Sequence, residues 1–98
     1  MTQPPDESPV RARIVVHGRV QGVGFRAFAS RAASDLRLLG GVRNLTDGRV
    51  ELDVEGGRSV IEALEQQLRI GPPAARVMKI ETEWKTATGR YSGFEIWY

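Results

Sequence analysis

The stretch VRNLTDGRVELDVE, residues 42–55, decides the fold class. In its second half the apolar Val50, Leu52 and Val54 are separated by single acidic residues, which is the two-residue period of a strand with one buried and one solvated face. The dipeptide Asp47-Gly48 is among those most favoured in tight hairpin turns. We therefore predict a β-hairpin in which residues 42–46 pair with residues 49–55.

Upstream of this hairpin, the pattern predicts a strand followed by a helix. Residues 11–17 alternate apolar positions with mostly polar ones, which indicates a second strand with one buried face. From Phe25 onward, apolar residues recur at helical spacing, so we expect an amphipathic helix that ends near Gly40. Its apolar stripe would consist of Phe25, Phe28, Ala29, Ala32, Leu36 and Leu39.

Downstream, a second helix and two more strands are predicted. Ser59 with Glu62 three residues later has the form of a capping box, and Gly71-Pro72-Pro73 would end the helix that follows it. An alternating strand should then carry Met78, Ile80, Thr82 and Trp84 on one face. After a loop over residues 89–93, residues 94–98 would form a short closing strand.

The order strand, helix, strand, strand, helix, strand predicts an α+β fold, the ferredoxin-like βαββαβ sandwich. This fold has an antiparallel sheet with both helices on one face, here with a short fifth strand in addition. We expect one domain over residues 10–98. Residues 1–9 hold three prolines and almost nothing apolar, so we expect a disordered N-terminal tail there.

Composition excludes several classes of site. The 98 residues include no cysteine and a single histidine, His17, which rules out a disulfide scaffold, a thiolate nucleophile and a cysteine-type zinc site. No apolar run is long enough to span a membrane, and the N-terminus does not resemble a signal peptide. A reducing cytoplasm is the expected location. The net charge is +2, and the first half of the chain is the more basic, so it should favour anions.

The segment HGRVQGVGFR, residues 17–26, is the candidate functional segment. It lies between a predicted strand and a predicted helix, contains three glycines, and places Arg26 in the first turn of that helix. Unpaired backbone N–H groups at a helix start form an anion site, and an arginine adds a two-pronged contact. The segment therefore predicts a phosphate-binding loop.

Two better-known phosphate motifs do not account for this segment. GVGFRA, residues 22–27, matches the dinucleotide fingerprint, but the chain is too short for a doubly wound sheet, and Asp47 has a sufficient local reason to occupy a turn. A P-loop would need Lys and then Ser or Thr after Gly24, where this chain has Phe25-Arg26.

The residues instead resemble a known family. GRVQGVGFR, residues 18–26, is similar to the signature loop of the acylphosphatases, and GVRNLTDGRVE, residues 41–51, is similar to their second signature. The resemblance continues through GPPAARV, residues 71–77, and SGFEI, residues 92–96. It implies a small enzyme that hydrolyses the carboxyl-phosphate anhydride of acyl phosphates without a metal or other cofactor.

The resemblance also implies roles for individual residues. Arg26 would be the phosphate-binding arginine, and Asn44 would place the attacking water. Backbone amides of Arg19, Val20, Gln21, Gly22 and Val23 would complete the phosphate-binding cradle. Taken alone, Asn44 would more simply bond the hairpin turn, and Arg26 would be an ordinary solvated helix residue.

The chain departs from the family pattern at two positions. Arg37 stands where a glycine commonly separates two leucines, and Gly41 replaces a frequent aromatic residue before Val42. Without that aromatic residue, the start of the second strand is expected to pack less tightly.

The expected partners are a small acyl phosphate as substrate and inorganic phosphate as product, with no nucleic acid and no membrane, and the expected assembly is a monomer. Two rival functions share features with this sequence. An RNA-recognition module shares the βαββαβ order, but residues 14–16 and 50–54 lack the aromatics that stack bases. A non-catalytic carbamoyl-phosphate module of a larger maturation enzyme is disfavoured by the chain length.

Overall fold

The computed structural model describes residues 7–98, in seven helices and strands. Along the chain these are β1 (Val10–Arg19), α1 (Phe25–Asp35), β2 (Leu39–Asn44), β3 (Val50–Gly56), α2 (Arg58–Ile70), β4 (Arg76–Thr86) and β5 (Phe94–Ile96). Most of the predicted tail, residues 1–6, lies outside the described residues. Neither helix in the described range is long and apolar enough to cross a membrane.

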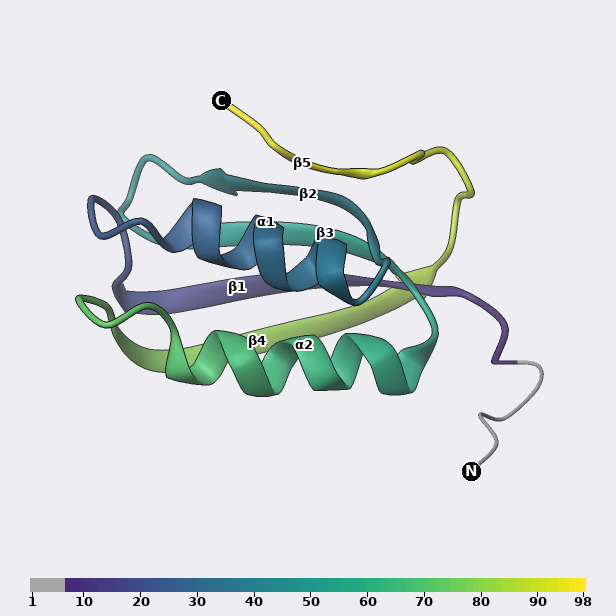
Figure 1. Ribbon diagram of the computed structural model, residues 1–98, viewed down its shortest axis with the longest axis horizontal. Coiled ribbons are helices and arrows are strands. Elements are labelled where there is room, and N and C mark those ends of the chain that lie inside the picture. Colours follow the sequence, from purple (N-terminus) through teal and green to yellow (C-terminus); the bar gives the residue numbers. More distant parts are fainter. Residues whose placement is uncertain (1–6) are drawn as a thin grey trace.

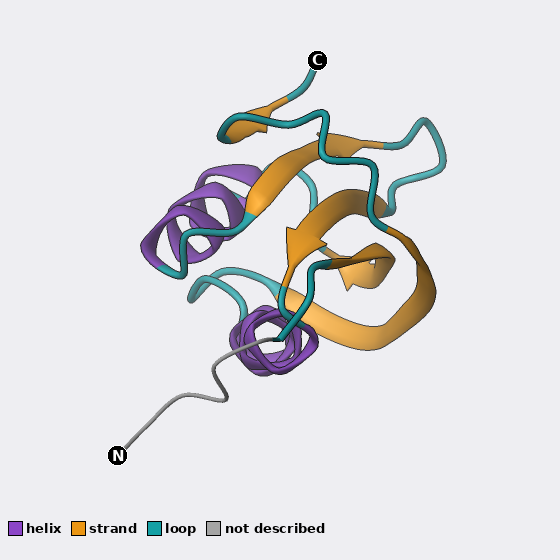
Figure 2. Cartoon of the chain, turned by 90° about the vertical axis from the view of Figure 1, so that its right-hand side faces the viewer, coloured by secondary structure: helices purple, strands orange, loops and turns teal. Residues whose placement is uncertain are grey.

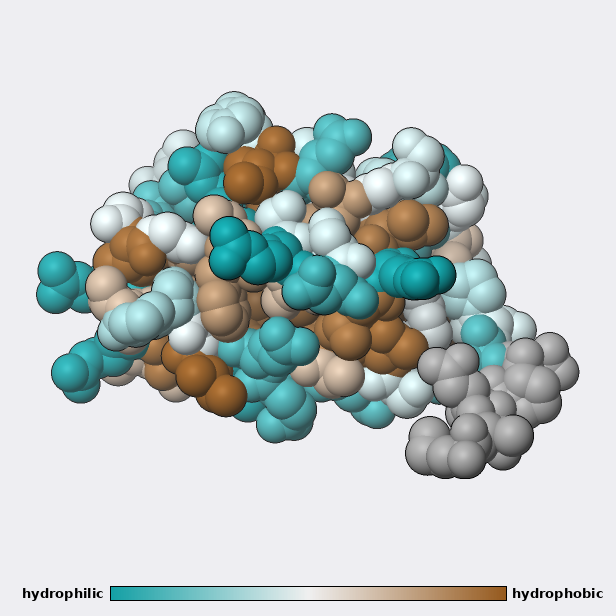
Figure 3. Space-filling view, viewed as in Figure 1, coloured by the Kyte–Doolittle hydropathy of each residue, from teal (hydrophilic) through white to brown (hydrophobic). Residues whose placement is uncertain are grey.

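The strands form one sheet in the order β4-β1-β3-β2-β5, with both helices packed on the same face (Figures 1 and 2). Neighbouring strands run antiparallel except for β5, which pairs with β2 in parallel. The α+β ferredoxin-like prediction is therefore confirmed, with a fifth strand that makes the sheet mixed. On the helix face, hydrophilic residues are interspersed with small hydrophobic patches (Figure 3).

The core lies between the sheet and the helices, as the alternation predicts. Ile14 and Val16 of β1 and Leu52 of β3 are fully buried, and their neighbours of opposite parity face the other side of the sheet. The hairpin register pairs Asn44 with Val50, and its loop covers residues 45–49. Within this five-residue loop the N–H of Leu45 donates to the carbonyl of Arg49 (2.8 Å), which leaves three residues, 46–48, at the tip instead of two.

Helix α1 ends at Asp35, earlier than predicted. The N–H of Leu38 donates to the carbonyl of Ala33, and the N–H of Arg37 donates to that of Ser34, each at 2.9 Å. This pair of bonds is the Schellman motif, which requires a left-handed residue directly after the helix cap. That residue is Arg37, with φ 59°.

The predicted helix end, Gly40, belongs to β2 instead. It has φ 131°, and a Cβ there would lie 1.9 Å from the carbonyl oxygen of Asp53 on β3, so a side chain would push the two strands apart. The next residue, Gly41, lies under the indole of Trp97, which would stand 2.2 Å from a Cβ at this position. An aromatic ring thus covers this part of β2 after all, supplied by the C-terminal segment.

Helix α2 begins without the predicted capping box. Its N-cap residue is Gly57, so Ser59 lies inside the first turn. The carboxylate of Glu7 takes the capping role, because it accepts hydrogen bonds from the N–H (3.1 Å) and the hydroxyl (2.8 Å) of Ser59. A carboxylate at a helix N-terminus also interacts favourably with the helix dipole.

Strand β4 follows the predicted alternation only in part. Ile80, Thr82 and Trp84 lie opposite the core-facing residues of β1, but Met78 is 77% exposed. The register shifts between His17 and Gly18, which pair with Lys79 and Val77, so Met78 is the extra residue of a β-bulge. The closing strand is also shorter than predicted and ends at Ile96.

Candidate active site

The connection between β1 and α1 is a tight loop over residues 20–24, shaped by two glycines with left-handed backbones. Gly22 has φ 74° and Gly24 has φ 79°, and a Cβ on either would meet no other atom within 4 Å. These glycines are therefore required by backbone conformation and not by lack of space. Gly24 is the N-cap of α1, which has no side-chain cap and no acidic residue in its first turn.

This arrangement leaves the start of α1 suited to a negatively charged ligand. The first N–H groups of a helix have no partner within the helix, and the positive end of the helix dipole lies there. Arg26, in the first turn, adds a full positive charge. The loop and the β2–β3 turn lie at the same end of the molecule (Figure 1).

A cavity of about 260 Å³ opens at this place, and it brings Arg26 and Asn44 together from two segments far apart in sequence. Arg26 comes from the first turn of α1, and Asn44 is the last residue of β2. The cavity is lined by Val20, Gly22, Gly24, Phe25, Arg26, Ala27, Asn44, Ile96 and Tyr98. The two proposed catalytic side chains thus share one cavity with part of the predicted cradle.

Arg26 is half-buried in this cavity, unlike a fully solvated helix residue. Its guanidinium carbon lies 5.0 Å from the centre of the Tyr98 ring, a cation–π distance. Tyr98 is itself 98% exposed, so this contact leaves the guanidinium open to a ligand. The N–H groups lie in the guanidinium plane, where a phosphate would bind.

Asn44 does not bond the hairpin turn, because another side chain does so. The amide nitrogen of Gln21 donates to the carbonyls of Leu45 (2.7 Å) and Arg49 (2.9 Å), which ties the phosphate-binding loop to the hairpin. Within residues 7–98, no hydrogen bond engages the side chain of Asn44. Its amide is therefore available to a ligand or water in the cavity.

Only some of the other predicted cradle residues line the cavity. Val20 is buried and Gly22 exposed, and both line the cavity. Arg19 is the exposed last residue of β1, opposite Arg76. Val23 packs against the core, and the side chain of Gln21 faces the hairpin, so these two and Arg19 do not line the cavity.

The lone histidine lies away from this cavity. The Nε2 atom of His17 is 2.6 Å from a carboxylate oxygen of Glu81, on the sheet face opposite the helices, as an outward-facing strand residue would be. The pKa of Glu81 is lowered, chiefly by this hydrogen bond.

Sequence reasoning missed the C-terminal wall of the cavity, formed by Ile96 and Tyr98. The two-residue period of Phe94, Ile96 and Tyr98 was a usable signal, because residues at this spacing point to the same side of a strand. What the sequence did not reveal is that β5 lies beside β2, which brings that side of β5 next to the start of α1.

Comparisons with known proteins identify the family of this chain. The family model described as Acylphosphatase matches residues 12–96. An acylphosphatase of Anaeromyxobacter dehalogenans is 54% identical over 87 residues, which is 89% of this chain and 94% of that protein.

Solved structures show the same likeness. A crystal structure of acylphosphatase from Bacillus subtilis matches with a TM-score of 0.88 and 36% identity, covering 91% of this chain and 99% of that one. A structure of an acylphosphatase from Coxiella burnetii matches with a TM-score of 0.83 and 38% identity, covering 90% and 92%. On the family match and the identity over most of its length, the chain belongs to the acylphosphatase family.

Proposed function

We propose that this protein hydrolyses the carboxyl-phosphate anhydride of small acyl phosphates in the cavity at the start of α1, with Arg26 binding the phosphoryl group and Asn44 placing the water. The observation that carries the proposal is that one cavity is lined by both side chains, together with a glycine-shaped loop and an uncapped helix start. The products are a carboxylate and inorganic phosphate.

Phosphoryl transfer depends mainly on positioning the groups and on neutralising the oxygens of the phosphoryl group. In the proposed complex, backbone N–H groups of residues 19–23 and of the first turn of α1 surround these oxygens. The guanidinium of Arg26 adds two parallel charge-assisted hydrogen bonds. Glycine at positions 22 and 24 allows this part of the chain to curl around the group.

The remaining step is attack by water. The side-chain amide of Asn44 offers both a donor and an acceptor, so it can hold a water in line with the bond that breaks, but it cannot act as a base. As the water oxygen bonds to phosphorus, the bond from phosphorus to the acyl oxygen breaks, and its electron pair leaves on the carboxylate. The water proton passes to the phosphate or to solvent.

No general acid is required for this leaving group. The conjugate acid of a carboxylate has a pKa of about 4, so it departs as an anion at neutral pH. The position of His17 on the other face of the sheet is consistent with this chemistry.

The test is hydrolysis of benzoyl phosphate by the folded protein in the presence of EDTA, which also tests the proposed independence from metal. We expect turnover, and we expect Arg26→Lys to lower kcat/KM by about 10²-fold or more, because an ammonium group cannot reproduce a two-pronged contact. Asn44→Ala should lower kcat by about tenfold or more through loss of water placement.

Arg31→Lys is the matched control for Arg26→Lys, since Arg31 is an exposed residue of the same helix outside the cavity. It should keep full activity. Hydrolysis of benzoyl phosphate no faster with folded protein than in buffer alone would refute the proposed function. Full activity of Arg26→Lys would remove Arg26 from the mechanism.

The proposal also covers the oligomeric state and the cellular location of the enzyme. We propose a monomer, which size-exclusion chromatography with light scattering tests directly. We propose the cytoplasm as its location, which the absence of cysteine favours and which cell fractionation tests.

A further inference from the structure

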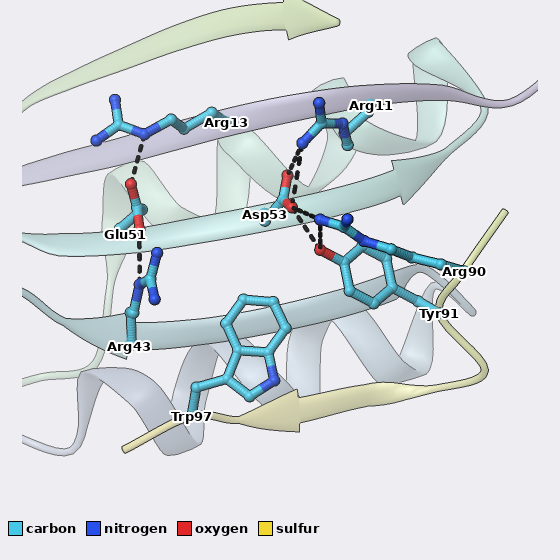
Figure 4. Close-up of a pocket in the computed structure, with 8 residues that line it drawn as sticks. All are labelled: Arg11, Arg13, Arg43, Glu51, Asp53, Arg90, Tyr91 and Trp97. Atoms are coloured by element: carbon cyan, nitrogen blue, oxygen red, sulfur yellow. Dashed lines mark hydrogen bonds and ion pairs between the residues drawn. The ribbon is translucent and has the colours of Figure 1, made fainter. Parts of the chain in front are cut away.

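A second cavity, of about 430 Å³, lies on the sheet face that the helices leave open. It is lined by Arg11, Arg13, Arg43, Glu51, Asp53, Arg90, Tyr91 and Trp97, which come from β1, β2, β3 and the C-terminal segment (Figure 4). None of these residues lines the cavity of the proposed active site. The proposed reaction gives them no role.

The cavity is built around two acidic residues of β3, each of which holds arginines from neighbouring segments. Glu51 accepts hydrogen bonds from the Nε atoms of Arg13 on β1 and Arg43 on β2, the latter at 2.8 Å. Burial opposes ionisation of Glu51, but the hydrogen bonds from both arginines outweigh it, and its pKa is lowered. Glu51 is therefore ionised at neutral pH.

Asp53 organises the other end of the cavity. It accepts a hydrogen bond from the Tyr91 hydroxyl (2.5 Å), and it lies 3.4 Å from Arg11 and 3.9 Å from Arg90 in ion-pair contacts. The pKa of Tyr91 is raised by burial and by this bond to Asp53, so its hydroxyl stays protonated as a donor.

Four arginines and two carboxylates give the lining a formal charge of +2. Each guanidinium has five N–H donors, and Arg13 and Arg43 use Nε toward Glu51, which leaves their terminal nitrogens for a ligand. Figure 4 shows the terminal nitrogens of Arg13 directed away from the shared carboxylate. The cavity thus holds an excess of positive charge and donors that fit a dianion.

The cavity also contains an aromatic platform. One face of the Trp97 indole rests on the bare backbone of Gly41, and the ring is seen broadside in the view of the open sheet face (Figure 4). Arg43 lies 5.9 Å from the indole, and Tyr91 lies 5.8 Å from it at a tilt of 41°. The exposed indole face is positioned to stack on a planar ring.

We propose that this cavity binds a mononucleotide, with the base on Trp97 and the phosphate among the arginines. A nucleoside monophosphate carries about two negative charges near neutral pH, which matches the charge of the lining. Ligand pockets typically have volumes of about 300–1,000 Å³, so this cavity suits one nucleotide.

An extended strand of RNA fits the face less well. On the same face, Glu81 and Glu83 of β4 are ion-paired with Lys79 and Lys85, so this edge of the sheet has no excess of positive charge to hold a phosphate backbone that continued across it. The aromatic residues are also confined to one end of the face. The observations therefore favour a single nucleotide over a chain.

The test is titration of the folded protein with AMP by isothermal calorimetry, repeated with the Arg26→Ala variant, which removes the proposed phosphate-binding arginine from the active-site cavity. We expect binding at one site, and weaker binding of both adenosine and ribose 5-phosphate, because each lacks half of the proposed contacts. Arg43→Ala and Arg90→Ala should each weaken AMP binding by about tenfold or more. Both side chains are exposed, so these variants should fold.

Arg31→Ala is the charge-matched control and should bind AMP as the unaltered protein does. In a second readout, AMP should quench tryptophan fluorescence in Trp84→Phe but not in Trp97→Phe, since these are the two tryptophans of the chain. An AMP affinity that is the same in Arg43→Ala and Arg90→Ala as in the unaltered protein would overturn the proposal, as would loss of AMP binding in Arg26→Ala. Tighter binding of a single-stranded RNA than of AMP would assign the face to nucleic acid instead.

Discussion

Replacing Arg37 with glycine should make the protein more stable, although it removes a long side chain. Arg37 has φ 59°, and within residues 7–98 it is the one non-glycine residue with a positive φ. Its N–H bonds Ser34, and the following residue bonds Ala33, so the conformation is fixed by the end of α1. Its exposed side chain makes no ion pair or hydrogen bond to the rest of the described chain.

The magnitude follows from two opposing effects. The left-handed conformation costs a residue with a Cβ about 1–2 kcal/mol, a cost that glycine avoids. Glycine in turn loses more backbone freedom on folding, which costs about 0.5–1 kcal/mol. The difference predicts that Arg37→Gly raises the free energy of unfolding by about 0.5–1 kcal/mol. For a chain of this length that corresponds to an increase in Tm of about 2–8 °C.

Urea unfolding followed by circular dichroism measures this difference, with thermal unfolding as a second measurement. Arg37→Ala is the control, because it removes the guanidinium but keeps the Cβ in the strained conformation. We expect Arg37→Gly to be more stable than both Arg37→Ala and the unaltered protein. If the glycine variant is no more stable than the alanine variant, backbone strain at this position is not the cause.

Two other perturbations test how the site is supported. Gln21→Ala removes both bonds to the hairpin carbonyls and should lower the free energy of unfolding by about 1–2 kcal/mol. It should also reduce kcat for benzoyl phosphate by loosening Asn44, and unchanged kinetics would show that this tie does not support catalysis. Glu55 is 3% exposed, and although burial opposes its ionisation, hydrogen bonds from Thr88 and Gly89 lower its pKa below the ordinary 4.5. Its contribution to stability is therefore present above pH 4.5 and is lost as the pH falls through the lowered pKa. Glu55→Gln should be destabilised at pH 7, and its difference from the unaltered protein in chemical denaturation should shrink at acid pH; a difference independent of pH would contradict this reasoning.

The fold was largely predictable because most apolar residues of its strands lie on one side of the sheet. The predicted solvated face of β3 was wrong, since Glu51 and Glu55 are buried there by hydrogen bonds from arginines and from the segment after β4. In β3, the apolar Val50, Leu52 and Val54 alternate with acidic residues. The strand can bury these three side chains only by turning that face toward the core. The errors fall where a local signal was absent or misleading. The end of α1 was missed because glycine usually marks such a position and this chain has Arg37 there. The bulge that exposes Met78 has a signal only on the partner strand, where Gly18 lies opposite it with φ 130°.

The candidate site was predictable only as far as its two motifs extend. Arg26 and Asn44 lie in segments whose pattern resembles a known family, and the structure places them in one cavity. The structural role of Gln21 could not be predicted from the sequence. Its bonds to the hairpin explain why Asn44 is free of the turn, and that arrangement depends on how two loops meet in space. Tyr98 was hidden for a similar reason, since its place depends on the parallel pairing of β5 with β2.

The same pairing links the two cavities. Adjacent residues of a strand point to opposite faces, so Asn44 and Ile96 line the cavity on the helix face while Arg43 and Trp97 line the cavity on the open face. Strands β2 and β5 therefore supply a wall to each cavity. A shift of one residue in the β5 register would turn Trp97 toward the helices and withdraw Tyr98 from Arg26. Both proposals thus depend on the register that pairs Val42 with Ile96.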